Sequence, residues 1–175
     1  MKRLLSVVAL CVFAACGSKS PAGPGGASVV QVAGVWRGTV RITSASGGEC
    51  LAPIFQSQVG GSTPATATFT QTGSNITATV TLMSNNAVCN YTGTAGASDV
   101  QMTGTCSAAA SPRNVPCPTG GGLRDVTLTN STVNGTVNGN TLTGTEVETS
   151  NVTASGATAV LGTLTLSNSF TVTKQ

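Results

Sequence analysis

Apolar and polar residues alternate along most of the chain after residue 31, where helical periodicity is hard to find. In residues 75–82 the apolar side chains occupy every second position, and residues 36–42 repeat this pattern. One apolar and one polar face are typical of strands in an antiparallel sheet. Turn signals recur at intervals of about ten residues, at Thr72-Gly73-Ser74, Ser84-Asn85-Asn86, Gly96-Ala97-Ser98 and Asn138-Gly139.

This spacing predicts an all-β fold, an antiparallel up-and-down meander of about eight to ten strands that closes into a small barrel. A β-sandwich is the alternative. The two differ in whether the strand that holds Trp36 pairs with the strand at residues 170–173, because that pairing closes the sheet. Residues 108–122 hold three prolines and three successive glycines, so we expect a long loop there.

A four-residue motif occurs five times: a large apolar residue, any residue, glycine and threonine. Its copies begin at Trp36, Tyr91, Met102, Val133 and Leu142. In a strand the apolar residue and the glycine share one face, so two paired copies can place each large side chain over the other's glycine. Covered glycines let a sheet bend sharply, as closure of a small barrel requires. Repetition by composition alone is the alternative.

Turn chemistry predicts how the copies pair. A type I′ turn at the Asn-Gly pair of residues 138–139 sets Gly135 opposite Leu142 and Val133 opposite Gly144. These two pairs match each large residue with a glycine of the neighbouring strand.

A four-residue loop at residues 96–99 does the same for an earlier hairpin. It sets Tyr91 opposite Gly104, and the same register places Cys89 directly opposite Cys106. The register therefore predicts a Cys89–Cys106 disulfide.

The N-terminus has the features of an export signal. Lys2 and Arg3 precede an apolar run over residues 4–15 that only Ser6 interrupts. As a helix this run is about 18 Å long, too short for a hydrocarbon core of about 30 Å. We expect residues 1–15 to be a cleaved signal peptide rather than a transmembrane anchor.

Phe13-Ala14-Ala15-Cys16 resembles the lipobox of bacterial lipoproteins, in which small residues precede a lipidated cysteine. The resemblance implies diacylglycerol on Cys16 and an acyl chain such as palmitate on the new N-terminus. Gly17 and Ser18 follow, with no Asp at the next position, which in a Gram-negative cell resembles cargo sorted to the outer membrane. In a Gram-positive cell the protein would instead stay on the outer face of the plasma membrane. We therefore expect a lipid-anchored protein of the cell envelope, on the outer membrane facing the periplasm or on the cell surface.

The leader and the anchor change how composition and cysteines are interpreted. Removing residues 1–15 takes two of eight cations, so six oppose five anions and the net charge falls from +3 to +1. Nucleic acid is therefore not expected as a partner.

Residues 16–31 are rich in Gly, Pro and Ser, which predicts a flexible tether, and residues 32–175 are expected to form one domain. Of the four remaining cysteines, Cys50 and Cys117 pair by elimination, and a chain without histidine offers little for zinc.

Gly34-Val35-Trp36 resembles the G-x-W signature of lipocalins, in which the Trp packs across the closed end of the barrel. The resemblance implies a carrier of a small apolar ligand; Trp36 as a plain core residue is the alternative. The residues expected to line the cavity of such a carrier are Trp36, Phe69, Val80, Tyr91, Met102 and Leu142.

Candidate chemistry is sparse. Glu146 and Glu148 share a strand face about 7 Å apart, which is compatible with acid–base work, but we interpret them as a solvated strand end or as partners of Arg124. With no histidine to act as a base, we expect no enzyme and no cofactor. The sequence predicts a membrane-anchored structural or interaction module that contacts an envelope protein. A carrier of a small apolar ligand is the alternative.

Overall fold

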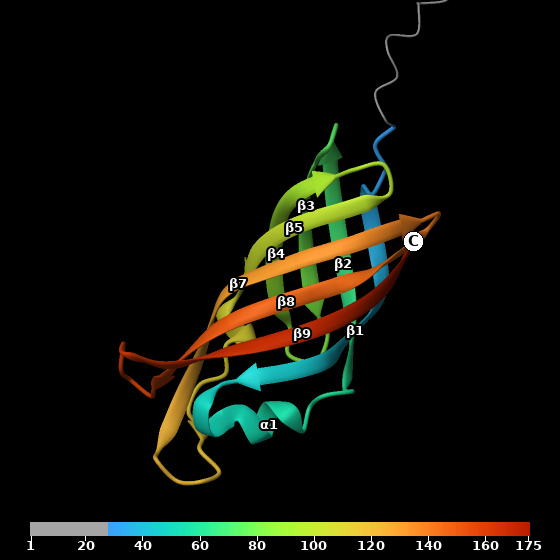
Figure 1. Cartoon of the computed structure of the whole chain (residues 1–175). Helices are drawn as coiled ribbons and strands as arrows, with labels where there is room; N and C mark the ends of the chain where they lie inside the picture. Colours follow the sequence, from blue (N-terminus) through green and yellow to red (C-terminus); the bar gives the residue numbers. More distant parts are fainter. Residues whose placement is uncertain (1–27) are drawn as a thin grey trace, which may run out of the picture.

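A computed structural model describes residues 28–175, which form an antiparallel sheet of nine strands (Figure 1). The strands are β1 (Gly34–Gly47), β2 (Ser62–Thr72), β3 (Asn75–Leu82), β4 (Ala87–Ala95), β5 (Asp99–Cys106), β6 (Val115–Pro116), β7 (Leu123–Asn138), β8 (Thr141–Ala154) and β9 (Val160–Lys174). The helical segments are η1 (Glu49–Leu51), α1 (Ala52–Gln56) and η2 (Ala108–Ala110). None of the helices between residues 28 and 175 is long and apolar enough to cross a membrane.

The sheet closes into an eight-stranded barrel, as the alternation predicts. Strand β1 pairs with β9, with Val40 opposite Phe170, and β5 pairs with β7, with Met102 opposite Val133. Strand β6 is an additional short strand that pairs with β7. The first and last strands are thus neighbours, and the sandwich alternative is wrong.

The β4–β5 hairpin has the predicted register. Tyr91 lies opposite Gly104 and Cys89 opposite Cys106, and the two cysteines form a disulfide. A second disulfide joins Cys50 to Cys117.

The predicted register of the β7–β8 hairpin is wrong. Asn138 pairs with Thr141, so the two loop residues are Gly139 and Asn140. Gly139 has a φ of 58°, whereas Asn140 has no positive φ. A glycine first in the loop fits a type II′ turn better than the type I′ turn we expected. Both strands keep their inward faces, because the pairing changes by an even number of residues.

This correction changes the neighbours of the glycines. Gly135 lies opposite Gly144, and Val133 opposite Glu146. The glycines are nevertheless covered by large side chains. A Cβ on Gly144 would lie 2.6 Å from Cζ of Phe170, and one on Gly135 would lie 2.8 Å from Cδ1 of Leu142.

Gly104 repeats the arrangement on β5, which pairs with β7, with Cδ1 of Tyr91 2.6 Å from the place of a Cβ. The motif thus brings strand backbones and large side chains together inside the barrel, although two of its partners differ from those predicted.

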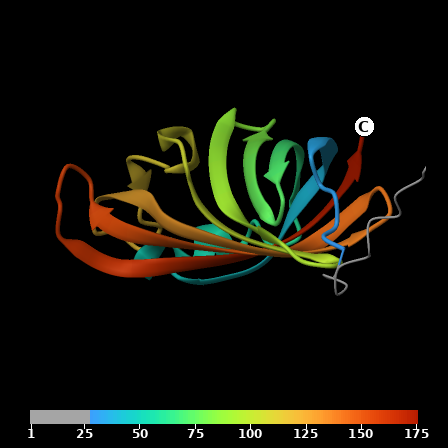
Figure 2. The ribbon, with the colours of Figure 1, turned by 90° about the horizontal axis from the view of Figure 1, so that it is seen from above.

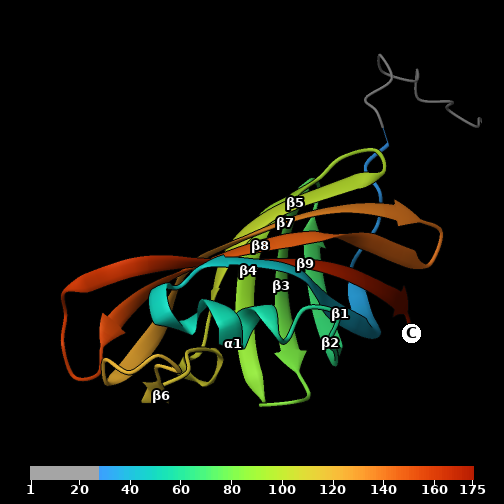
Figure 3. The ribbon, with the colours of Figure 1, turned by 60° about the horizontal axis from the view of Figure 1, so that its bottom comes forward.

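The barrel has a closed end and an extended end. At the closed end, Trp36 is fully buried, and its indole Nε1 donates a hydrogen bond to the Val32 carbonyl at 2.7 Å. At the other end, β7, β8 and β9 reach beyond the shorter strands, as the view from above shows (Figure 2). The helix α1 lies across this end with Phe55 buried (Figure 3). Alternation alone did not predict α1, because five residues are too few to reveal a helical period.

The predicted signal peptide, Cys16 and most of the tether lie outside the described residues. The chain meets the barrel at its closed end, where the amide of Val30 donates to the carbonyl of Gly96 at 2.8 Å. The side chain of Gln71 holds the same segment through Val32 and Val30.

Candidate functional site

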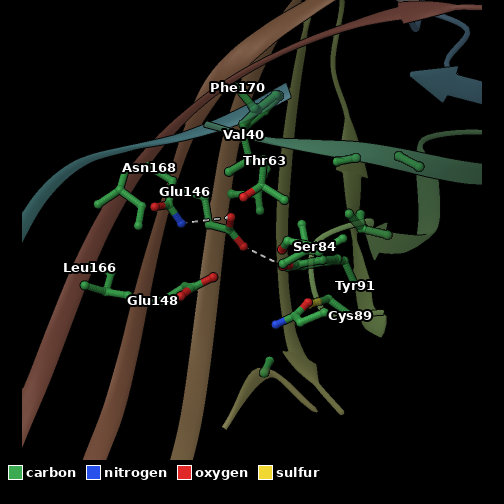
Figure 4. Close-up of a pocket in the computed structure, with 18 of the residues that line it drawn as sticks. Val40, Thr63, Ser84, Cys89, Tyr91, Glu146, Glu148, Leu166, Asn168 and Phe170 are labelled. Atoms are coloured by element: carbon green, nitrogen blue, oxygen red, sulfur yellow. Dashed lines mark hydrogen bonds between the residues drawn. The ribbon is translucent and has the colours of Figure 1, made fainter. Parts of the chain in front are cut away.

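The barrel encloses a cavity of about 250 Å³. Its lining runs from Phe69, beside the closed end, to Phe55 of α1, and most of it is apolar. Figure 4 shows part of this lining. Its lining continues to Gln58, Ser84 and Asn85, which are exposed at the α1 end. The cavity therefore opens toward α1 and the β3–β4 turn, away from the closed end.

The structure places five of the six predicted lining residues around this cavity. These are Phe69, Val80, Tyr91, Met102 and Leu142. Trp36 does not line it. Trp36 instead packs edge-on against Phe69, with ring centroids 6.1 Å apart, and Lys174 Nζ lies 5.8 Å from its ring. The indole thus seals the closed end beneath the cavity.

A buried hydrogen-bond network surrounds Glu146 on the cavity wall. Its Oε1 accepts hydrogen bonds from Tyr91 Oη at 2.5 Å and from Ser131 Oγ at 2.6 Å. Its Oε2 accepts one from Asn168 Nδ2 at 3.3 Å. Ser131 and Asn168 lie on β7 and β9, the strands paired with β8, whereas Tyr91 comes from β4 and reaches Glu146 only because the barrel is closed. A carboxylate can only accept hydrogen bonds, so a buried one needs donors around it. Glu146 has three such donors.

Tyr91 serves this network as a donor. Burial, followed by the charge of Glu146, raises the pKa of Tyr91 above its ordinary value of 10. The phenol therefore stays protonated at neutral pH and keeps its proton directed toward Glu146.

Glu148 lies one inward position further along β8, toward the α1 end. Its side chain points into the cavity, as Figure 4 shows, and neither of its oxygens has a hydrogen-bond partner among residues 28–175. Burial, and then the charge of Glu146, raise the pKa of Glu148 to about 7. The two neighbouring carboxyl groups thus differ: Glu146 has three donors and Glu148 has none.

Asn168 completes the polar part of the wall. It is 5% exposed and lies opposite Glu146 on β9. Its amide nitrogen is used by Glu146, while its Oδ1 is the one buried side-chain oxygen or nitrogen without a partner in the described part of the chain. A buried acceptor without a hydrogen bond lowers stability by about 1–3 kcal/mol, so a donor placed at this oxygen would be stabilising.

Our interpretation of the glutamates as a solvated strand end is wrong. Glu146 is 8% exposed, and Arg124 pairs with Glu49 at 3.4 Å instead. The sequence contained a signal for this, because the inward face of Leu142 and Gly144 continues through the even-numbered positions to Glu146. The sequence did not indicate Ser131 and Asn168, whose roles depend on the registers of β7 and β9 against β8.

The chain matches no protein-family model, and no curated protein or solved structure shows a significant match to it. The cavity and its wall are therefore the features of the chain that bear on its function.

Proposed function

We propose that this protein binds a small organic molecule inside its barrel. The observation that best supports this proposal is the cavity of about 250 Å³, which combines an apolar lining with polar groups that converge on one wall. Such a lining is typical of ligand sites, although the volume lies just below their usual range of about 300–1,000 Å³. A water molecule takes about 30 Å³ of liquid, so the space suits roughly eight to ten non-hydrogen atoms.

We propose a binding role rather than a catalytic one. The buried carboxylate of Glu146 is already engaged by three donors, and the chain has no histidine to act as a general base. We prefer ligand binding to a structural or interaction module as well. A module that acts only through its outer surface needs no polar network inside, and polar groups in a core are costly unless something pairs with them.

Filling the cavity tests the proposal. Val40 lines it from β1, while its neighbour Thr39 is exposed on the outer face of the same strand (Figure 4). We expect the full-length protein to bind the neutral probe 2-phenylethanol, with a Kd near about 1 mM by ligand-observed NMR. Val40→Phe should abolish this binding and Thr39→Phe should leave it unchanged. A wild-type protein that binds no probe, or a Val40→Phe variant that binds as well as wild type, would overturn the proposal.

We further propose that a lipidated Cys16 tethers the barrel to the cell envelope. The lipobox-like sequence Phe13-Ala14-Ala15-Cys16 supports this, as do two disulfides, which are characteristic of exported proteins. The described chain enters the barrel at the closed end, so a tether from there leaves the cavity mouth free (Figure 1).

Labelling cells with radioactive palmitate tests the anchor. The wild-type protein should take up label and sediment with membranes, because more than one acyl chain is needed for stable anchoring. The Cys16→Ser variant should lose both properties, whereas Cys11→Ser, a change within the expected leader, should keep them. A Cys16→Ser protein that remains membrane-bound contradicts the assignment.

A further inference from the structure

Acceptor groups gather around Glu146 and Glu148 on one part of the cavity wall. Glu148 has no hydrogen-bond partner within residues 28–175, and Asn168 Oδ1 is buried without one. Glu146 Oε2 accepts only the 3.3 Å bond from Asn168 and so has capacity for another donor. Glu146 and Glu148 lie on β8 and Asn168 on the adjacent β9. The hydroxyl groups of Thr63 and Ser150 also line the cavity but form no hydrogen bond with these acceptors, so a ligand that brings donors would satisfy them.

The charge of the wall is also one-sided. The lining contains two glutamates and neither lysine nor arginine. Arg113 and Arg124, the arginines that form ion pairs among the described residues, pair with Asp125 and Glu49 instead. An uncompensated charge in a mostly apolar cavity is costly, so a cation is the partner that stabilises it most.

We propose that the ligand of this cavity is a compact organic cation, a protonated amine on an apolar body, whose N–H groups donate to Glu148, Asn168 Oδ1 and Glu146. This inference rests on the proposed binding function and specifies its ligand class. The apolar body lies against the remainder of the lining, in which Phe69, Val80 and Met102 take part.

The surroundings favour an amine over a metal ion. Calcium takes six to eight oxygen ligands and magnesium near-octahedral oxygen geometry. Here one of the two carboxylates is occupied by Tyr91 and Ser131, and most of the wall is carbon. No group of three or more His, Cys, Asp or Glu suited to a metal ion occurs in the part of the chain that the structure describes. An ammonium group with three donors matches the three acceptors.

The titration of Glu148 agrees with this ligand class. The titratable groups that line the cavity are Glu146 and Glu148 from β8 and Tyr91 from β4; the lining residues of the other strands and α1 do not titrate. Burial and the charge of Glu146 raise the pKa of Glu148 to about 7, so near neutral pH a proton occupies the place of a cation about half the time. Proton and ligand therefore compete at Glu148.

Three probes of similar size and different charge test the proposal on the full-length protein: 2-phenylethylammonium, 2-phenylethanol and phenylacetate. We expect the ammonium to bind about tenfold more tightly than the alcohol, the value of one charge-assisted hydrogen bond, and phenylacetate not to bind. Glu148→Gln, which keeps the side-chain shape, should reduce the preference about tenfold, whereas Asp99→Asn, on the exposed β5 start, should not. Affinity for the ammonium should fall as pH drops below about 7 in wild type and not in Glu148→Gln.

The outcomes separate the two proposals. Equal binding of the ammonium and the alcohol, or a Glu148→Gln variant with the wild-type preference, overturns the cation assignment and leaves the binding function intact. Displacement of the ammonium by low-millimolar calcium chloride, but not by equal ionic strength of sodium chloride, also overturns it in favour of a metal site. Failure of all three probes to bind removes the binding function as well.

Discussion

Glu148 is an ionisable residue in surroundings that disfavour its charged form. Its carboxyl group is half-buried, faces Glu146, and receives no hydrogen bond from residues 28–175. Glu146 beside it shows the alternative, since Tyr91, Ser131 and Asn168 compensate its burial. Residues that keep an uncompensated ionisable group in a cavity are candidates for function, because stability alone does not favour them.

The same environment makes stability depend on pH. The pKa of Glu148 is raised from 4.5 to about 7, so between these values the folded protein binds more protons than the unfolded chain. Protonation of Glu148 therefore contributes fully to the free energy of unfolding below about pH 4.5, and this contribution is lost as pH rises through 7. We expect urea unfolding without ligand to show a free energy of unfolding roughly 1–3 kcal/mol lower at pH 8 than at pH 5, and Glu148→Gln to remove most of this difference.

Two features make that pH comparison specific. Asp125, whose pKa is lowered chiefly by the hydrogen bond from the Asn114 amide, titrates below the range used. The control Asp99→Asn removes an exposed acid and should keep the wild-type slope. A Glu148→Gln variant that loses stability between pH 5 and pH 8 as wild type does would show that another group is responsible.

At the scale of strands, the sequence was sufficient where two constraints agreed. The β4–β5 register followed both from the loop length and from Cys89 facing Cys106, and both disulfides formed as predicted. The β7–β8 register rested on the Asn-Gly signal alone, which is compatible with loops at 138–139 and at 139–140. Period-two alternation still placed the right face inward, because the error was an even number of residues.

For the candidate site too, one part could be predicted from the sequence and another could not. Alternation placed Phe69, Val80 and Met102 toward the cavity, since a local pattern decides which face is buried. It did not reveal that Glu146 would meet Tyr91, because those residues lie 55 positions apart and meet only across the closed barrel. Local pattern therefore predicts the apolar wall, whereas the contact between Tyr91 and Glu146 depends on closure of the barrel.

At the scale of the whole molecule, the two ends of the barrel have different roles. The closed end holds Trp36 and receives the chain from residues 29–32, while the α1 end carries the mouth of the cavity (Figure 1). The long strands β7–β9 extend past the barrel and are stabilised there by Cys50–Cys117 and the buried Leu51 (Figure 3). A ligand would enter at the end opposite the proposed tether.

The position of a bound probe decides whether the cavity is the binding site, and intermolecular nuclear Overhauser effects with 2-phenylethylammonium measure that position. We expect contacts from the probe to Val80, Met102 and Leu166, all of which line the cavity. The exposed apolar residues of the long strands, such as Val147 and Val160, should show none. Contacts at those outer residues, with none inside the barrel, would contradict the account.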